Sequence, residues 1–181
     1  MAQIVLVSGA SVAIHKACDL ASKLTQDGHK VRAILTRSAV KLVSPQLFEA
    51  LTSEPAYTDE FGATRRTAMD HIDLAKWGQC FVVAPCTADL IAKFALGLAD
   101  DLATTTALAL PTSVPRLLCP AMNPGMLAAP PVRRHLETLQ GDGWSVLSPD
   151  EVRMACGDEG QGRLPEPQKI AAWIEKSLAR R

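Results

Sequence analysis

Short runs of β-branched and other apolar residues alternate along this chain with stretches whose apolar residues recur at helical spacing. The runs that we expect to be strands are 4–8, 31–36, 80–85, 116–119 and 144–147, and the stretches between them that we expect to be helices are 13–26, 38–51, 88–96, 102–110, 126–140 and 168–181. Strands separated by helices require crossover connections, which favour parallel pairing. The pattern therefore predicts an α/β fold: a doubly wound, Rossmann-like or flavodoxin-like parallel sheet with helices on both faces.

Length and composition agree with this architecture. The 181 residues predict a single domain spanning 1–181, which is large enough for a sheet buried between helices. Aromatic residues make up only 4% of the chain, although 48% of it is hydrophobic, so the core must be mainly aliphatic. Aliphatic strands are typical of parallel sheets covered on both faces.

Charge, hydrophobic runs and cysteine spacing exclude several classes of partner and site. Lysine plus arginine total 19 and aspartate plus glutamate total 19, so the net charge is zero and nucleic acid is not expected as a partner. No apolar run approaches the ~20 residues that span a bilayer, so no membrane segment is expected. The N-terminus runs directly into the first strand without a signal peptide, which favours a cytoplasmic protein. Five cysteines without a Cys-x-x-Cys pair fit neither a disulfide framework nor a metal site.

In a doubly wound sheet, ligands bind beyond the carboxyl ends of the strands. The first such turn, Ser8-Gly9-Ala10-Ser11, has one glycine where a dinucleotide turn has three. Together with Thr36-Arg37-Ser38 after the second strand, it could hold a single phosphate, which favours a mononucleotide. Ser11 could equally be only a helix cap.

Later turns and loops carry further candidates. Thr87 starts a helix after the third strand, and Asn123 could offer a ligand both a donor and an acceptor, although each also suits a plain turn. His71 stands between two aspartates before the third strand, where a structural role is the ordinary alternative. Cys156 lies in a glycine-rich segment that we expect to be a flap, and its thiol is a candidate acid or an unused side chain.

Five segments together resemble the flavin-dependent cysteine decarboxylases, and within them the branch that acts on phosphopantothenoylcysteine in coenzyme A synthesis. The resemblance covers nearly the whole chain. The segments are SGASVAIHK at 8–16, MDHIDLAKW at 69–77, APCTADLIAK at 84–93, PAMNPGM at 120–126 and ACGDEGQGRLPEP at 155–167.

The resemblance implies a non-covalent FMN. It assigns the phosphate to Gly9, Ala10, Ser11, Thr36 and Ser38, and the ring to Thr87, Ala88, Asp89, Leu90, Ala121 and Met122. It implies catalytic roles for His71, Asn123 and Cys156. It implies a substrate site formed by Asn123, Met126, Ala155 and Cys156, with no metal.

The chemistry implied is decarboxylation without net oxidation. FMN would oxidise the cysteine side chain to a thioaldehyde, CO₂ would leave to give an enethiolate, and return of the hydride with a proton from Cys156 would give 4′-phosphopantetheine. His71 would assist the oxidation or position the carboxylate, which Asn123 would bind.

Some residues depart from the family pattern. His15 and Leu127 stand where an aromatic residue is common, and Asp89 stands where many members have asparagine. Bacterial members often continue into a C-terminal ligase domain. The sequence here ends at Arg181, so we expect this chain to be the decarboxylase alone. The resemblance also implies a homo-oligomer, a trimer or dodecamer, whose site is completed between subunits.

Two other functions stay open from the sequence. One is oxidative decarboxylation of a C-terminal peptidyl cysteine, which would use FMN and the same histidine but need a groove for a peptide. The other is a non-catalytic, flavin-binding regulatory protein, which would not need His71, Asn123 and Cys156 together. A prenyl-transferring flavoprotein is a weaker alternative, because it would not need the Pro-x-Met-Asn turn.

Overall fold

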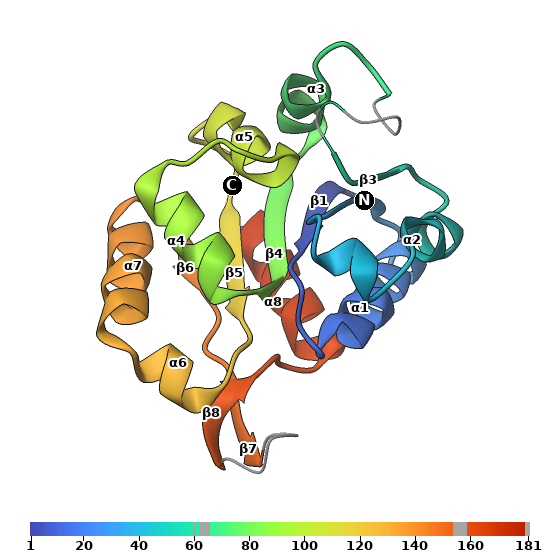
Figure 1. Cartoon of the computed structure of the whole chain (residues 1–181). Helices are drawn as coiled ribbons and strands as arrows, with labels where there is room; N and C mark the ends of the chain where they lie inside the picture. The colour runs from blue at the N-terminus through green and yellow to red at the C-terminus, as the bar shows by residue number, and fades with distance from the viewer. Residues whose placement is uncertain (60, 62–65, 154–158, 180–181) are drawn as a thin grey trace.

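A parallel sheet forms the centre of the molecule (Figure 1). The computed structural model describes residues 1–59, 61, 66–153 and 159–179. The sheet has six strands in the order β3-β2-β1-β4-β5-β6, all parallel. They are β1 (Gln3–Ser8), β2 (Lys30–Leu35), β3 (Ala56–Tyr57), β4 (Cys80–Cys86), β5 (Arg116–Pro120) and β6 (Ser145–Val146). The expected doubly wound α/β fold is confirmed.

Helices cover both faces of the sheet. One hydrophobic cluster joins the sheet to α1 (Ile14–Gln26), α2 (Pro45–Thr52) and α8 (Pro167–Leu178). The other joins it to α3 (Asp70–Trp77), α4 (Ala88–Leu96), α5 (Leu102–Ala109) and α7 (Pro130–Gly141). The short 3₁₀ helix η1 (Ala39–Lys41) follows β2, and α6 (Pro124–Ala128) follows β5.

The strand sequences explain the two layers. Side chains alternate across a strand, so in β1 Ile4 and Leu6 enter the first cluster while Val5 and Val7 enter the second. All four are fully buried, as expected for a central parallel strand. The second layer also holds Phe81 with its ring edge-on to Trp144, at 6.1 Å between centroids.

Four local features differ from the sequence expectations. The segment between 51 and 80, for which the sequence indicated neither strand nor helix, contains the two-residue edge strand β3 and helix α3. The single helix expected over 126–140 is divided into α6 and α7, because Pro130 and Pro131 lack the N–H groups that would continue α6. The glycine-rich segment near the end contains an antiparallel hairpin, β7 (Asp150–Arg153) and β8 (Glu159–Arg163).

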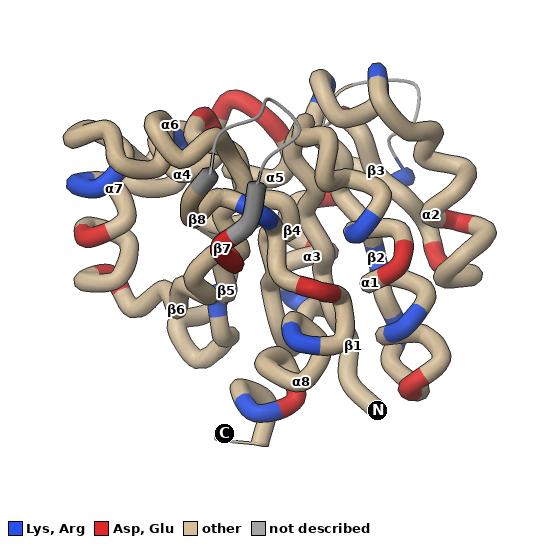
Figure 2. Tube along the Cα trace, turned by 90° about the horizontal axis from the view of Figure 1, so that it is seen from below, with Lys and Arg blue, Asp and Glu red and all other residues tan. Residues whose placement is uncertain are grey.

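Acidic and basic positions are interspersed along the chain trace seen from below (Figure 2). No described helix is both long enough and apolar enough to cross a bilayer.

Candidate cofactor and active site

The carboxyl ends of β1 and β4 meet at the point where the strand order reverses. The Ser8 hydroxyl donates to the Ala84 carbonyl at 3.0 Å, and the Gly9 N–H donates to the Pro85 carbonyl at 3.0 Å. A Cβ on Gly9 would lie 3.0 Å from that same carbonyl oxygen and from the side chain of Thr87. Gly9 therefore lets the turn after β1 pack closely against the turn after β4 at the switch point, where doubly wound folds bind ligands.

Two adjoining cavities open at this edge. The first cavity, of about 570 Å³, lies beside the end of β2, and the second cavity, of about 680 Å³, lies beside the end of β5. Both volumes are in the range of small-ligand sites. The residues that line both are Ala10, Thr87, Ala88 and Met126. Because these residues form a shared wall, one ligand could extend from one cavity into the other.

Helices begin around this wall with polar side chains. The Thr87 hydroxyl accepts from the Leu90 N–H at 3.4 Å, and Asn123 Oδ1 accepts from the Gly125 N–H at 2.8 Å. The Ser11 hydroxyl accepts from the Ala13 N–H at 3.2 Å. Thr87 and Asn123 are therefore helix caps, whereas Ser11 forms a turn bond before α1 and does not cap it. All three also line a cavity.

Basic residues line the second cavity, and Glu166 pairs with two of them. Lys16, Arg163 and His15 are among its lining residues, and no carboxylate is found among those described. Lys16 is 5% exposed and its ammonium donates to Glu166 at 2.7 Å and to the Leu164 carbonyl at 2.9 Å. The hydrogen bond from Lys16 lowers the pKa of Glu166. Arg163 reaches the same carboxylate at 3.2 Å.

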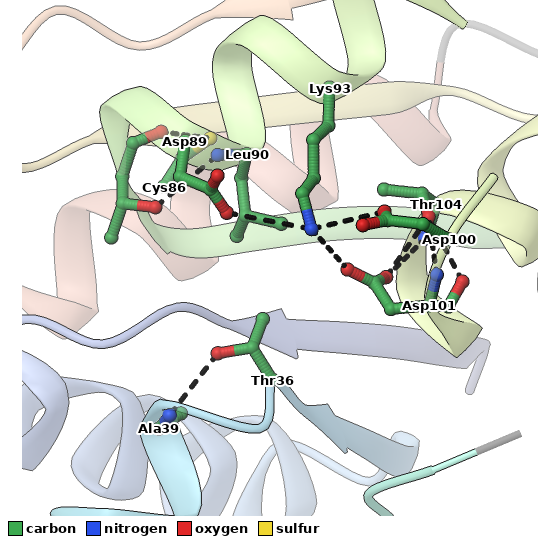
Figure 3. Close-up of polar contacts among 10 residues, drawn as sticks. Thr36, Ala39, Cys86, Asp89, Leu90, Lys93, Asp100, Asp101 and Thr104 are labelled. Atoms are coloured by element: carbon green, nitrogen blue, oxygen red, sulfur yellow. Dashed lines mark hydrogen bonds and ion pairs between the residues drawn. The ribbon is translucent and has the colours of Figure 1, made fainter. Parts of the chain in front are cut away.

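The first cavity has the opposite balance. Asp59, Asp89, Asp100 and Asp101 line it, with Lys93 and Arg37 as the cations. Figure 3 shows the Lys93 ammonium between Asp89 of α4 and the aspartates at the start of α5, at 3.0 Å from Asp100 and 3.1 Å from Asp101. Burial lowers the pKa of Lys93, but hydrogen bonds to Asp100 and Asp101 outweigh it and leave the pKa raised. Lys93 thus joins α4 to α5 along the cavity wall.

The hairpin packs against the turn that carries Asn123. The Met122 N–H donates to the Gly162 carbonyl at 3.0 Å. A Cβ on Gly162 would lie 2.2 Å from the Met122 carbonyl oxygen, so the two backbones approach too closely for any side chain there. Gly160 is close to Pro124 in the same way, at 3.3 Å from a Cβ to its side chain. The base of the expected flap is therefore fixed at the second cavity, whereas Ala155 and Cys156 lie outside the described residues.

His71 is placed apart from the cavities. It is the second residue of α3, its Nδ1 is buried, and it lines neither cavity. In Figure 1, α3 and the β7–β8 hairpin lie at opposite ends of the molecule. One chain therefore does not bring His71 to Asn123.

Most of the other candidates surround the cavities. The lining residues that the sequence pointed to are Ala10, Ser11, Thr36, Ser38, Thr87, Ala88, Asp89, Ala121, Met122, Asn123 and Met126. Gly9 and Leu90 line neither cavity: Gly9 packs against the turn after β4, and Leu90 is 1% exposed.

Sequence reasoning assigned no role to Lys16, Arg163 or Lys93. A signal existed for Lys16, because it lies four residues before Leu20 on the apolar face of α1, where a buried cation needs a partner. That partner, Glu166, is 150 positions away in the sequence. No local pattern could indicate it.

Comparison with known proteins gives a consistent assignment. A family described as Flavoprotein matches residues 1–179. The coenzyme A biosynthesis bifunctional protein CoaBC of Bacillus subtilis is 44% identical over 173 residues, which cover 96% of this chain and 42% of that protein. A probable phosphopantothenoylcysteine decarboxylase of Streptococcus mutans is 34% identical over 176 residues, which cover 97% of this chain and 98% of that protein. The chain thus spans about two fifths of the first relative and nearly all of the second.

Solved structures share the whole fold. A PPC decarboxylase mutant in which serine replaces a cysteine, complexed with pantothenoylaminoethenethiol, has a TM-score of 0.84 and 29% identity, covering 97% of each chain. The FMN-dependent cysteine decarboxylase SpaF has a TM-score of 0.81 and 25% identity, covering 98% of this chain and 97% of that one. On the sequence match over 1–179 and these whole-chain similarities, this chain belongs to the flavoprotein family.

Proposed function

We propose that the chain is an FMN-dependent decarboxylase that converts 4′-phosphopantothenoylcysteine to 4′-phosphopantetheine in coenzyme A synthesis. The observation that carries the proposal is the pair of adjoining cavities at the switch point, with Asn123 and the base of the hairpin at the wall of the second. The names of the relatives from Bacillus subtilis and Streptococcus mutans support the same substrate. We place the activity in one domain, 1–181, acting in the cytoplasm.

The residues present fit FMN. Helix α1 begins without a side-chain cap, and the positive end of its dipole favours an anion near this start. The hydroxyls of Ser11, Thr36 and Ser38 line the cavities around that helix start, and they would hold the phosphate. Ala88, Ala121 and Met122 offer small or apolar walls for the ring. When bound, FMN supplies reversible two-electron oxidation of the cysteine side chain.

The second cavity suits an anionic substrate. A carboxylate entering it would meet the amide of Asn123 and the basic side chains of Lys16 and Arg163, which also pair with Glu166. We propose that Asn123 binds the carboxylate that is lost, with Met126 and Ala155 beside it.

Two further residues would orient the substrate and supply a proton. We propose that His71 assists the oxidation or orients the carboxylate, and that Cys156 supplies the proton in the reducing step. The PPC decarboxylase mutant that lacks one cysteine is complexed with an enethiol compound, which supports an enethiol as the species left when that proton is withheld.

We also propose that the protein acts as a homo-oligomer. His71 lines neither cavity of its own chain, so a neighbouring copy would bring its α3 to the site. Exposed apolar side chains at Leu96, Leu98 and Leu108, on α4, α5 and the loop between them, support an interface on this side of the molecule.

Product analysis with two substrates tests the proposal. Protein loaded with FMN is incubated separately with phosphopantothenoylcysteine and with a peptide that ends in cysteine, and the products are identified by mass spectrometry. We expect CO₂ release and 4′-phosphopantetheine from the first and no reaction with the second. Turnover of the peptide alone would favour the peptidyl-cysteine activity, and FMN retention without turnover of either would favour a binding protein.

A further inference from the structure

The turn that leads into α3 is organised around one buried carboxylate. We propose that Asp70 is a positioning residue that acts through His71, holding the start of α3 so that the imidazole is presented in one orientation. This inference rests on the proposed role of His71. It concerns a residue for which the resemblance implies no role.

The contacts of Asp70 are specific. Its side chain is 2% exposed and accepts the Thr67 N–H at 2.7 Å on Oδ1 and the Arg66 N–H at 3.0 Å on Oδ2. A carboxylate that accepts backbone N–H groups forms charge-assisted hydrogen bonds, which are stronger than those between neutral groups. The two bonds use both oxygens, so they fix the carboxylate plane as well as its position.

A third contact distinguishes Asp70 from its neighbour on the helix. The Thr67 hydroxyl lies 2.9 Å from Asp70 Oδ1 and 2.6 Å from Asp73 Oδ2. It has one proton, so it donates to one of these carboxylates at a time. Asp73 is exposed, and this hydroxyl is its hydrogen-bond donor, whereas Asp70 keeps its two backbone donors in either case.

The turn is also tied to the rest of the fold. Arg66 forms an ion pair with Glu49 of α2, and its guanidinium lies 5.7 Å from the ring centre of Tyr57 in β3. Glu49 in turn accepts the Ala56 N–H at 3.2 Å. A chain of contacts therefore runs from α2 and β3 through Arg66 to Asp70.

His71 follows Asp70 directly and has its Nδ1 buried. An amide at position 70 would place an N–H₂ group against one of the backbone donors and lose that bond. The first turn of α3 would then reorient, and His71 with it. Small displacements of a catalytic group lower the reaction rate, because the reacting atoms must meet within a narrow range of distances and angles.

The test compares Asp70→Asn with the matched control Asp73→Asn, which removes the same charge from the same turn. Rates with phosphopantothenoylcysteine are expressed per bound FMN, so that loss of folded protein does not count. We expect Asp70→Asn to lower kcat by about tenfold or more with KM within about twofold, and Asp73→Asn to stay within about twofold in both.

A spectroscopic arm reports on His71 directly. The chain has four histidines, so selective labelling of the imidazoles gives a short NMR spectrum, in which His71→Asn identifies one signal. Asp70→Asn should shift that signal and leave the other three in place, whereas Asp73→Asn should shift none. Asp70→Asn with an unmoved His71 signal or an unchanged kcat would overturn the inference.

If Asp70→Asn does not fold, Thr67→Val replaces it. It removes the hydroxyl that contacts Asp70 and Asp73 and accepts the Met69 N–H at 3.3 Å, but it keeps both backbone N–H bonds to Asp70. It should shift the His71 signal and lower kcat by a smaller factor, and an unmoved signal would again overturn the inference. A wild-type protein that fails to decarboxylate would contradict the proposed function instead, and the NMR arm would still decide the role of Asp70.

Discussion

Individual residues at this site hold the local fold and also line the cavities. The sequence left Ser11, Thr87 and Asn123 open between helix caps and ligand contacts, and the structure gives all three a capping or turn bond while placing them at a cavity wall. These two roles are compatible because a side-chain oxygen that accepts one N–H keeps a second lone pair. Residue identity alone could not separate the roles, since both require the same side chain.

The pKa values of the buried thiols are another property that the sequence alone does not indicate. Cys86 and Cys119 are fully buried, and burial raises the pKa of both, so neither is disposed to act as a thiolate. The sequence indicated only that the cysteines fit neither a disulfide framework nor a metal site. The structure therefore leaves the acid role proposed for Cys156 without competition from these two cysteines.

The requirement for glycine at position 162 can be tested by substitution. Gly162→Ala would force a Cβ to within 2.2 Å of the Met122 carbonyl oxygen, so β8 must move away from the turn that carries Asn123. We expect a loss of about 1–3 kcal/mol in unfolding free energy, as for overpacking, together with a raised KM, measured by thermal melts and steady-state rates.

Gly141→Ala is the matched control, because a Cβ there meets nothing within 4 Å. It should change the unfolding free energy by less than about 1 kcal/mol. If Gly162→Ala behaved like this control, the close approach of β8 to the turn would not hold in solution.

At the scale of elements, the long apolar strands and the amphipathic helices were predictable, and the short pieces were not. β3 has two residues and lies in a polar stretch, so no period of two could indicate it. α3 has eight residues and is held at its start by contacts of Asp70 within the preceding turn, not by a strong apolar face. The hairpin was hidden by its glycines, of which Gly160 has a φ of +141° and Gly162 allows the contact with Met122.

Separation of α3 from the hairpin gives a prediction about subunits. If the site combines the cavities of one copy with α3 of another, His71→Asn and Asn123→Ala should each be inactive alone. Co-expressed and purified as a mixed oligomer, they should regain activity, because some sites then hold both native residues. Mixed oligomers as inactive as their parents would place both residues in one chain, and the two proteins mixed after purification provide the control.

At the scale of the molecule, the order of elements determined most of the architecture in advance. Alternating strands and helices predicted the parallel sheet, and the switch-point rule indicated which turns would surround the cavities. The opposite charge balance of the two cavities was not predictable. It depends on Lys16 meeting Glu166 and on Lys93 meeting Asp101, pairs that form only once the chain has folded.

Every role proposed for this protein depends on FMN binding in the cavities at the carboxyl ends of β1, β2, β4 and β5. The most direct measurement is the visible absorbance of the purified protein after incubation with excess FMN and removal of the unbound flavin. We expect a yellow protein whose ratio of FMN to chain approaches unity. A folded protein that stays colourless after this treatment would contradict it.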